Sequence, residues 1–533
     1  MEVQGEKCTS ITRMIFELSI KPPKSYGRKE TLWSRAKQSM TVLKSRKGNN
    51  MDYTKEQSAI INETGRLVVV RALAGTGKTS TLLGYAKSKP HVRMLYIVLN
   101  KSVQKEAEQK FKATGVKPMT SHGLAFRYTG SKYQHKLAKG NLKPYEIESA
   151  LGISKELQKE IGYYGSYNDN MVIASIVLET LTKFLYSPDK EIQIILYQAE
   201  RLWTKMIDTE DSTVPMIHDG YLKLFQLSNP VLSGYDEFLV DEAQDSNPCT
   251  LSIIFKQTGK IVLVGDDQQA IYGWRGARNA LAFAIKQGAE VHYLTGSFRF
   301  GENIARVANA VLDIKGVDYE VRGLGGQDKI GRIEEDQQKT IISRTNAGVF
   351  SRTAQAINNE KSWWHVGGSE GYRFDQILDV YYLWNRMFDS IRDPFIKSFT
   401  DFTELKLYVE DVGDPELKPR CRIAEEYGDA VPVIVDKIKG KVGAASTIDS
   451  ADTVLGTCHK MKGLEADNVL LDDDFIELCE LTDILNKASP GEKAEQLRKA
   501  NEELNILYVG VTRAKKVLQL NMDLFSYFAN KSE

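Results

Sequence analysis

The sequence predicts an α/β protein with two parallel-sheet units in tandem, each interrupted by a helical insertion. Two observations predict this class. Short apolar segments, typical of strands buried on both faces of a sheet, alternate with helical segments along most of the chain. The glycine-rich and acidic motifs directly follow such segments, where ligands bind in parallel sheets. The length of 533 residues fits roughly three or four domains or subdomains.

The first unit is expected over residues 51–120 and 231–290. Its strands are expected at Leu67–Arg71, Met94–Leu99, Phe238–Val240 and Ile261–Val264. A helical pattern follows the first of these strands through Lys87. The intervening residues 121–230 are polar, rich in Lys, Glu and Tyr, and helical in pattern, so they are expected to form an inserted helical subdomain.

The second unit is expected over residues 291–346 and 447–533. Its strands are expected at Val291–Leu294, Thr340–Ser343, Val454–Thr457, Asn468–Leu471 and Val517–Asn521. Residues 347–446 between these parts are expected to form a second, reduced insertion. Within it, Trp363 and Trp364 precede a Val-Gly-Gly sequence, and a packing role is expected for both tryptophans.

Residues 1–50 form a basic segment without sustained periodicity. They hold eleven Lys and Arg against four Asp and Glu, a net charge of +7, and the rest of the chain therefore carries −6 because the total is +1. A flexible tail is expected here, and an arm that binds DNA or a partner protein is the alternative. A third reading is that translation begins at Met51.

The composition argues against several classes of protein. With 42% hydrophobic and 26% charged residues, the chain resembles an ordinary soluble protein. No apolar run is long enough to span a bilayer and no signal peptide is evident, so no membrane partner is expected. The five cysteines form no C-x-x-C pair, so no zinc or iron–sulfur cluster is expected. Scattered thiols indicate a cytoplasmic or nuclear location.

A glycine-rich loop follows the first strand, in the sequence Arg71-Ala-Leu-Ala-Gly-Thr-Gly-Lys-Thr79. Backbone N–H groups of such a loop converge on phosphate oxygens, and the following helix adds positive potential. Lys78 would neutralise phosphate charge and the Thr79 hydroxyl would bind Mg²⁺. The strict phosphate-loop pattern has glycine where this chain has Ala72. The alternative is a simple glycine turn between strand and helix.

An acidic pair ends the strand at Phe238–Val240. Asp241 can hold Mg²⁺, and Glu242 can orient and deprotonate an attacking water. On its own, the pattern D-E-x-x-D is common on protein surfaces. Together with the glycine-rich loop it predicts a nucleotide-hydrolysing site.

Further motifs resemble those of superfamily 1 helicases of the UvrD/Rep/PcrA type. The resemblance rests on Thr54-x-x-Gln57, Asn100-Lys101, Ser121–Leu124, Gly265–Ala277, Ser297–Phe300, Thr457–Glu465 and Leu507–Ala514, in the family's order. The motif sequences ALAGTGKT, NKS and SFRFG are most similar to those of the F-box DNA helicase branch and its viral or bacterial relatives. The resemblance implies two RecA-like P-loop domains in tandem, with ATP in the cleft between them.

The resemblance also implies roles for individual residues, with ATP and Mg²⁺ as cofactors. The implied catalytic residues are Lys78, Asp241, Glu242, Gln269, Arg275, Arg299 and Arg513. The implied nucleotide-binding residues are Gln57, Ala74, Gly75, Thr76, Gly77, Lys78, Thr79, Ser80, Phe298 and Glu465, and Thr79 and Asp241 would hold the metal. Gln57 and Phe298 would bind the adenine, Glu465 the ribose, and the arginines the γ-phosphate.

The expected DNA track is local, because the net charge of +1 gives no global field. Trp274 is the main candidate for stacking on bases, and Tyr272 is equally consistent with packing. Asn100, His122 and His459 are expected to contact the DNA backbone. Many relatives have an aromatic residue where this chain has Leu99, so a stacking pocket is not expected there.

These features predict an ATP-dependent 3′→5′ DNA helicase or translocase acting on single-stranded DNA and on junctions between single and double strands. Replication or recombination proteins are possible partners of such an enzyme. One alternative is a translocase that strips proteins such as recombinase filaments from DNA, with little unwinding. Another is a nucleotide-dependent interaction protein without catalysis, which the intact catalytic residues argue against.

Overall fold

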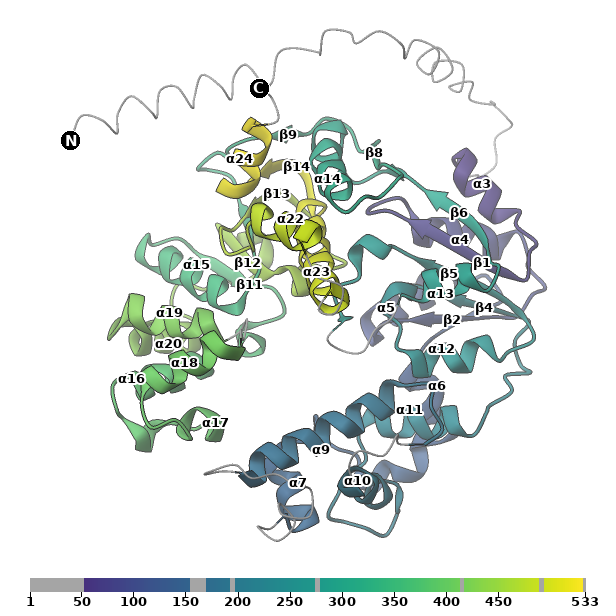
Figure 1. Cartoon of the computed structure of the whole chain (residues 1–533). Coiled ribbons are helices and arrows are strands. Elements are labelled where there is room, and N and C mark those ends of the chain that lie inside the picture. Colours follow the sequence, from purple (N-terminus) through teal and green to yellow (C-terminus); the bar gives the residue numbers. More distant parts are fainter. Residues whose placement is uncertain are drawn as a thin grey trace. The chain divides into compact units, whose positions relative to one another are not determined.

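The computed structural model describes residues 52–153, 169–191, 197–273, 279–412, 417–487 and 493–530 (Figure 1). Lys55–Glu533 forms one compact unit. Residues 1–50, expected to be a basic tail, lie outside the described residues, as do Trp274 and Arg275. No helix in the described ranges combines the length and the apolar character needed to cross a membrane.

The first sheet has six parallel strands in the order β3-β2-β4-β5-β1-β6 (Figure 1). The strands are β1 (Leu67–Ala72), β2 (Met94–Val98), β3 (Val116–Thr120), β4 (Glu237–Val240), β5 (Lys260–Gly265) and β6 (Glu290–Leu294). Both faces of this sheet are buried. Val69 of β1 packs in one core with Leu263 and Leu281, whereas Val68 packs in another with Leu82. Burial on both faces explains why these strands read as continuous apolar runs.

Strand β6 corrects one expectation. Val291–Leu294 was expected in the second unit, but in the structure it pairs with β1 as the edge strand of the first sheet, in the register Val69 to Val291. The first sheet therefore extends beyond the expected boundary at residue 290. We call this sheet, with the helices that cover it, the first lobe.

The second sheet also has six parallel strands, in the order β11-β12-β10-β13-β14-β9. The strands are β9 (Lys329–Ile330), β10 (Lys339–Ser343), β11 (Trp363–His365), β12 (Thr453–Thr457), β13 (Ala466–Leu471) and β14 (Ala514–Gln519). Its faces are buried in the same way, since Val454 and Leu455 of β12 pack in two different cores. This sheet and its helices form the second lobe.

The second insertion is smaller than expected. Helix α15 (Asn346–Asn358) packs on β10 and β12, and β11 pairs with β12, so both belong to the second lobe rather than to an insertion spanning residues 347–446. Trp363 is buried and Trp364 partly buried, as their expected packing role requires. The insertion itself consists of α16 (Asp375–Trp384), α17 (Pro394–Lys397), α18 (Phe402–Val412), α19 (Leu417–Tyr427) and α20 (Ala430–Lys439).

The other helices belong to the lobes and to the first insertion. The first lobe contains α3 (Lys55–Ile61), α4 (Lys78–Lys87), α5 (Lys101–Lys110), α6 (Ser121–Tyr128), α12 (Pro248–Phe255) and α13 (Ala280–Lys286). The first insertion contains α7 (Pro144–Leu151), α9 (Asp169–Tyr186), α10 (Tyr197–Ile207) and α11 (His218–Leu227). The second lobe contains α14 (Glu302–Ile314), α21 (Cys458–Met461), α22 (Leu478–Lys487), α23 (Lys493–Val511) and α24 (Met522–Asn530).

Candidate functional site

The glycine-rich loop joins β1 to α4, as the sequence predicts. Gly75 and Gly77 both have positive φ angles, 73° and 80°, which glycine adopts without steric cost. Ala72 stands where the strict pattern has glycine, but it is the last residue of β1 and pairs with Leu294. An extended strand position accepts alanine, so this departure leaves the loop intact.

The loop lies tightly against residues expected to bind the adenine. A Cβ atom on Gly75 would lie 2.6 Å from Ser297 Oγ, and one on Gly77 would lie 3.0 Å from Gln57 Nε2. Phe298 N donates to Gly75 O at 2.9 Å, and the Phe298 ring is 50% exposed. The structure therefore brings Gln57, Phe298 and the loop together, with an aromatic face left accessible.

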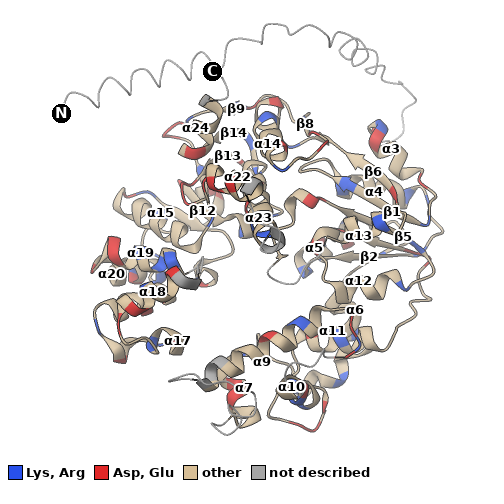
Figure 2. Ribbon diagram, in the orientation of Figure 1, with Lys and Arg blue, Asp and Glu red and all other residues tan. Residues whose placement is uncertain are grey.

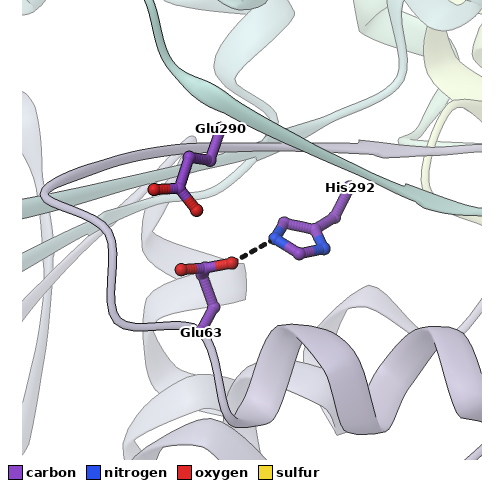
Figure 3. Close-up of side chains that lie close together, drawn as sticks. All are labelled: Glu63, Glu290 and His292. Atoms are coloured by element: carbon purple, nitrogen blue, oxygen red, sulfur yellow. Dashed lines mark hydrogen bonds and ion pairs between the residues drawn. The ribbon is translucent and has the colours of Figure 1, made fainter.

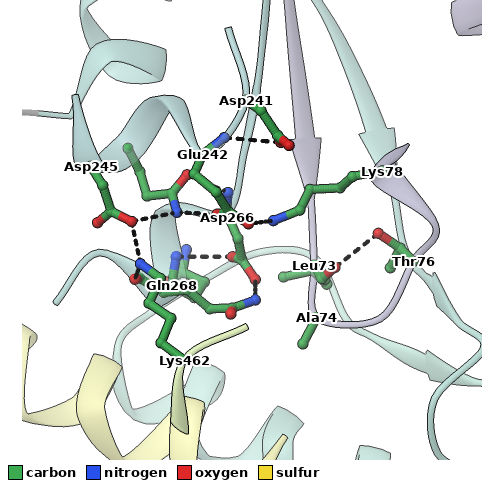
Figure 4. Close-up of polar contacts among 12 residues, drawn as sticks. Leu73, Ala74, Thr76, Lys78, Asp241, Glu242, Asp245, Asp266, Gln268 and Lys462 are labelled. Carbon is green, nitrogen blue, oxygen red and sulfur yellow. Dashed lines mark hydrogen bonds and ion pairs between the residues drawn. The ribbon is translucent and has the colours of Figure 1, made fainter. Parts of the chain in front are cut away.

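The acidic pair after β4 lies directly opposite Lys78 (Figure 4). Lys78 Nζ donates to Glu242 Oε1 at 2.8 Å, and Tyr96 of β2 donates to Asp241 Oδ2 at 2.5 Å. Glu242 has a φ angle of 46°, which is costly for a residue with a Cβ atom. Such strain is common at active sites, where the surrounding structure holds a side chain in place.

Burial and neighbouring charges set the protonation of this site. Burial and the adjacent Glu242 charge raise the pKa of Asp241. Burial opposes ionisation of Glu242 as well, but the Lys78 ammonium holds the pKa of Glu242 below its usual range. Burial raises the pKa of Asp245 and of Asp266, each to about 6. Strongly shifted carboxyl groups gathered in one place are typical of catalytic sites.

Two arginines of the second lobe reach this site. Arg513 is 1% exposed, and its Nη2 donates to Gln269 Oε1 at 3.0 Å. Burial and the nearby Arg299 charge lower the pKa of Arg513 to about 9. Arg299 donates from Nε to Glu465 Oε2 at 3.0 Å. A desolvated Arg513 beside Gln269, together with Arg299 next to Gly75 of the loop, suits a group with several negative charges.

Further contacts link the lobes through Lys462 and Tyr508, to which the sequence assigned no role. Lys462 forms a buried ion pair with Asp245 and also donates to Gln269 O at 2.5 Å. The N–H of Ala74 donates to Tyr508 Oη at 3.4 Å. Lys462 and Tyr508 lie inside recognised motifs, which is the signal that could have identified them. Tyr96 lies within an apolar strand and gave no such signal.

The residues expected to bind DNA are only partly brought together. Tyr272 Oη donates to His459 O at 3.3 Å, and their rings lie 6.0 Å apart, so these two residues meet across the lobes. Burial lowers the pKa of His459 to about 4, so its ring is neutral near pH 7. His122 instead hydrogen-bonds Asp219 of α11 at 2.9 Å, and the Asn100 side chain caps α5.

The residues present fit ATP and Mg²⁺. A Cβ atom would be crowded at Gly75 and at Gly77, so the loop keeps the compact form in which backbone N–H groups bind phosphate. Thr79 is the second residue of α4 and is partly buried. The next residue, Ser80, is exposed. The Thr79 hydroxyl and the Asp241 carboxylate are the oxygen ligands that Mg²⁺ prefers.

A second group of ligand-type side chains lies at the amino ends of the strands, away from this site. Glu63, Glu290 and His292 place their polar atoms within 4.8 Å of one another (Figure 3). Glu63 already accepts hydrogen bonds from Thr64 N, from Gly65 N and, at 2.5 Å, from His292 Nε2. Its oxygens are therefore occupied in joining the α3–β1 turn to β6, which is a structural task.

Comparison with known families is consistent with this geometry. Residues 93–289 match the family described as the UvrD/REP helicase N-terminal domain, and residues 442–523 match the UvrD-like helicase C-terminal domain. The first segment covers much of the first lobe with its insertion, the second lies in the second lobe, and they include Glu242 and Arg513 respectively.

Two similar proteins extend over most of the chain. F-box DNA helicase 1 of Gallus gallus is 34% identical over 88% of this chain, and F-box DNA helicase protein 1 of Schizosaccharomyces pombe is 30% identical over 90%. The chain spans 49% and 58% of the lengths of these two relatives. ATP-dependent DNA helicase PcrA of Leuconostoc citreum is 30% identical over 34% of this chain and 29% of its own length. The ordered motifs, the two parallel sheets and both family matches agree, and the chain belongs to the UvrD-like helicase family.

Proposed function

We propose that this protein is an ATP-dependent DNA helicase that hydrolyses ATP between its two lobes and moves along single-stranded DNA. The contact between Arg513 and Gln269 carries this proposal, because it joins the second lobe to the first beside the Glu242 carboxylate. An arginine placed in this way stabilises charge on a transferring phosphoryl group and is worth ~10³–10⁵ in rate. Closure of the lobes would therefore complete the catalytic site.

The chain's own residues divide the task. Glu242 is ionised and paired with Lys78, and a bound phosphate would compete for the Lys78 ammonium. Glu242 is then free to orient a water and accept its proton. Gln244 Nε2 donates to Glu242 Oε2 at 2.6 Å and keeps the carboxylate in place. Mg²⁺, held by Thr79 and Asp241, would supply charge neutralisation at the phosphates.

The remaining site assignments are part of the proposal. Gln57 and Phe298 would hold the adenine and Glu465 the ribose, and Ala74, Gly75, Thr76, Gly77, Thr79 and Ser80 would line the phosphates. Arg299 would contact the γ-phosphate with Arg513, and Arg275 would join them. Trp274 would stack on DNA bases.

Three helix N-termini support a track for the DNA backbone. Helices α5, α6 and α15 begin directly after β2, β3 and β10, at the carboxyl edges of the two sheets. Their N-caps are Asn100, Thr120 and Thr345. Helix N-termini attract phosphate groups, so these starts, together with His122, would bind successive phosphates. Figure 2 shows basic and acidic residues interspersed along the ribbon, which agrees with a local rather than a global attraction for DNA.

Polarity and the preferred DNA structure are tested by one set of assays. ATP hydrolysis is measured with and without single-stranded DNA, and strand displacement is measured on 3′-tailed, 5′-tailed and forked duplexes. We expect DNA-stimulated hydrolysis and displacement of the 3′-tailed duplex, which is the 3′→5′ direction. Lys78→Ala and Glu242→Gln should both abolish the DNA-stimulated hydrolysis. Unchanged turnover in both variants would reject the site.

A second candidate is a translocase that strips proteins such as recombinase filaments from DNA. The small second insertion, built from helices of 4 to 11 residues, favours this candidate because it offers little surface for holding a duplex. Displacement of a recombinase filament without displacement of a forked duplex would select this function. A DNA substrate in either case supports a nuclear or cytoplasmic location, with replication or recombination proteins as partners.

A further inference from the structure

A cavity of about 860 Å³ lies between the lobes, outside the nucleotide site. Its described lining includes Arg71 and Asp267 of the first lobe and Lys315, Tyr319 and Asn505 of the second, but none of the loop residues 72–79 that follow Arg71. Arg71 Nε pairs with Asp267 at 2.9 Å. The cavity thus borders the loop that follows β5 on a side where no nucleotide contact is expected.

Lys315 is the C-cap residue of α14. Its side chain lines the cavity and extends to the first lobe. Its ammonium donates to the side-chain oxygens of Gln268 and of Asn505. Gln268 is 6% exposed and also donates from Nε2 to Tyr319 Oη at 3.3 Å. One lysine therefore joins a residue next to Gln269 to the long helix α23.

Asn505 holds the same loop independently. Its Nδ2 donates to Ala270 O at 2.8 Å, and the Asn505 side chain is buried. Helix α23 continues for six residues beyond Asn505 and leads directly to Arg513, which binds Gln269 from the nucleotide side. The segment Asp266–Ala270 is thus held on two sides by elements of the second lobe.

We propose that Lys315 and Asn505 form a second linkage between the lobes, which positions Gln269 for catalysis when the cleft closes. The inference rests on the proposed function of the Gln269 and Arg513 site. Within the described ranges, the hydrogen bonds of Lys315 and Asn505 reach the loop beside Gln269 and none of the nucleotide-binding residues, so both act as positioning residues. Lys315 faces the Asp266 and Asp267 carboxylates and the Gln268 and Asn505 amides, and the Gln268 amide also bonds the Tyr319 hydroxyl. The linkage is therefore strongest when Lys315 is charged, because a charged donor forms a stronger hydrogen bond than a neutral one.

The first test is steady-state ATP hydrolysis by Lys315→Met on single-stranded DNA. A hydrogen bond to a charged group is worth ~1.5–3 kcal/mol, so kcat should fall about tenfold to a hundredfold. The KM for ATP should stay within about twofold, because no nucleotide contact is lost. Lys361, exposed on the second lobe, provides the matched control, and Lys361→Met should behave as wild type. A kcat of Lys315→Met equal to wild type, or a loss confined to KM, overturns the proposal.

Two further readouts separate positioning from general structure. Lys315→Met added to Gln269→Ala should cause no further loss, because both changes disable the same element; additive losses indicate a merely structural role. Burial lowers the pKa of Lys315 to about 8, so wild-type kcat should fall as pH rises through about 8. Lys315→Met should lack this fall, and Lys315→Arg should retain activity while moving the fall to higher pH.

A readout that does not need turnover tests the linkage apart from the proposed function. Dyes on Lys286→Cys of the first lobe and Asp336→Cys of the second, with Cys8 and Cys479 replaced by serine, report the approach of the lobes when ADP and beryllium fluoride bind. We expect the fluorescence-transfer change of Lys315→Met to be less than half that of the parent. Equal changes overturn the linkage, whereas absent DNA-stimulated hydrolysis with unequal changes overturns only the proposed function.

Discussion

The parallel strands of the first sheet all start at one side and end at the other, which we call its amino edge and its carboxyl edge. Ionisable side chains at these two edges are in opposite environments. At the amino edge, Glu63 accepts two backbone N–H groups and a histidine, and these hydrogen bonds hold its pKa down to about 2. At the carboxyl edge, burial raises the pKa of Asp245 and of Asp266 to about 6. The carboxylate at the amino edge is thus stabilised by hydrogen bonds, whereas those at the carboxyl edge are destabilised by burial.

This difference separates structure from chemistry within one sheet. A carboxylate with several donors stabilises the fold and has little remaining capacity for a ligand. A desolvated carboxylate such as Asp266 or Asp241 gains when a cation, a proton or a phosphate-bound metal reaches it. Glu242 also has a positive φ angle, which is costly for a residue with a Cβ atom and is common at catalytic sites. The residue types alone do not distinguish the two edges.

The largest expected effect is at the arginine that completes the carboxyl edge. Arg513→Ala should lower DNA-stimulated kcat by ~10³–10⁵, because a buried cation that stabilises the phosphoryl group is lost. Arg513→Lys keeps the charge but not the forked geometry and should recover only part of the rate. Both are measured by steady-state phosphate release, with nucleotide binding followed separately. A kcat within tenfold of wild type for Arg513→Ala would contradict the assignment.

The same chemical change at the two edges gives the most direct comparison. Glu242→Gln should lower kcat by ~10²–10⁴, because the general base is lost, while thermal stability stays the same or rises. Glu63→Gln provides the matched control and should leave kcat unchanged. Phosphate release and thermal unfolding of both variants are the measurements. Equal kcat losses in the two variants would remove the distinction between the edges.

A smaller effect is expected at the buried ion pair between Asp245 and Lys462. The pKa of Asp245 is about 6, so its carboxylate is ionised above that pH and neutral below it. Wild-type kcat should therefore fall as pH decreases through about 6, when the pair with Lys462 loses its attraction. Asp245→Asn should be about tenfold slower at pH 7.5 and should show a smaller acidic fall, because Asp266 at the same site still titrates near pH 6. An identical pH profile in variant and wild type would show that the pair does not limit turnover.

The smallest effect concerns the stability of the amino edge. Glu63→Gln should lose about 1.5 kcal/mol of unfolding free energy at pH 7, because hydrogen bonds to a charged group are replaced by neutral ones. The folded-state pKa of Glu63 lies below its ordinary value of 4.5. Its contribution is therefore complete above pH 4.5 and disappears as pH falls toward 2.

Urea unfolding at several pH values measures this loss, and the difference between wild type and Glu63→Gln should shrink over that acidic range. Added Zn²⁺ or Mn²⁺ should leave the midpoint of both proteins unchanged, since the Glu63 oxygens are already occupied. A metal-dependent rise in the wild-type midpoint that Glu63→Gln lacks would instead make this edge a metal site.

Much of the nucleotide side of the molecule follows from local sequence. The glycine-rich loop, the acidic pair and the strands that precede them form where the sequence predicts, because each depends on contiguous residues whose pattern sets their conformation. Successive residues of β1 pack into two different hydrophobic cores, one on each face of the sheet. A strand buried on both faces must be apolar at successive positions, and the sequence shows such a run. The meeting of Gly77, Gln57 and Phe298 was expected only through the family's motif order.

The sequence by itself determined the fold class and the family, and it supplied the candidates for the reacting side chains. Only the tertiary structure decided that Val291–Leu294 joins the first sheet, that β11 joins the second, and that Lys315 and Asn505 hold the loop beside Gln269. Lys315 and Asn505 are 190 positions apart in the sequence, and a local sequence pattern cannot indicate a contact over that separation. Strand order and contacts between lobes depend on which distant surfaces exclude water together, which is a property of the whole folded chain.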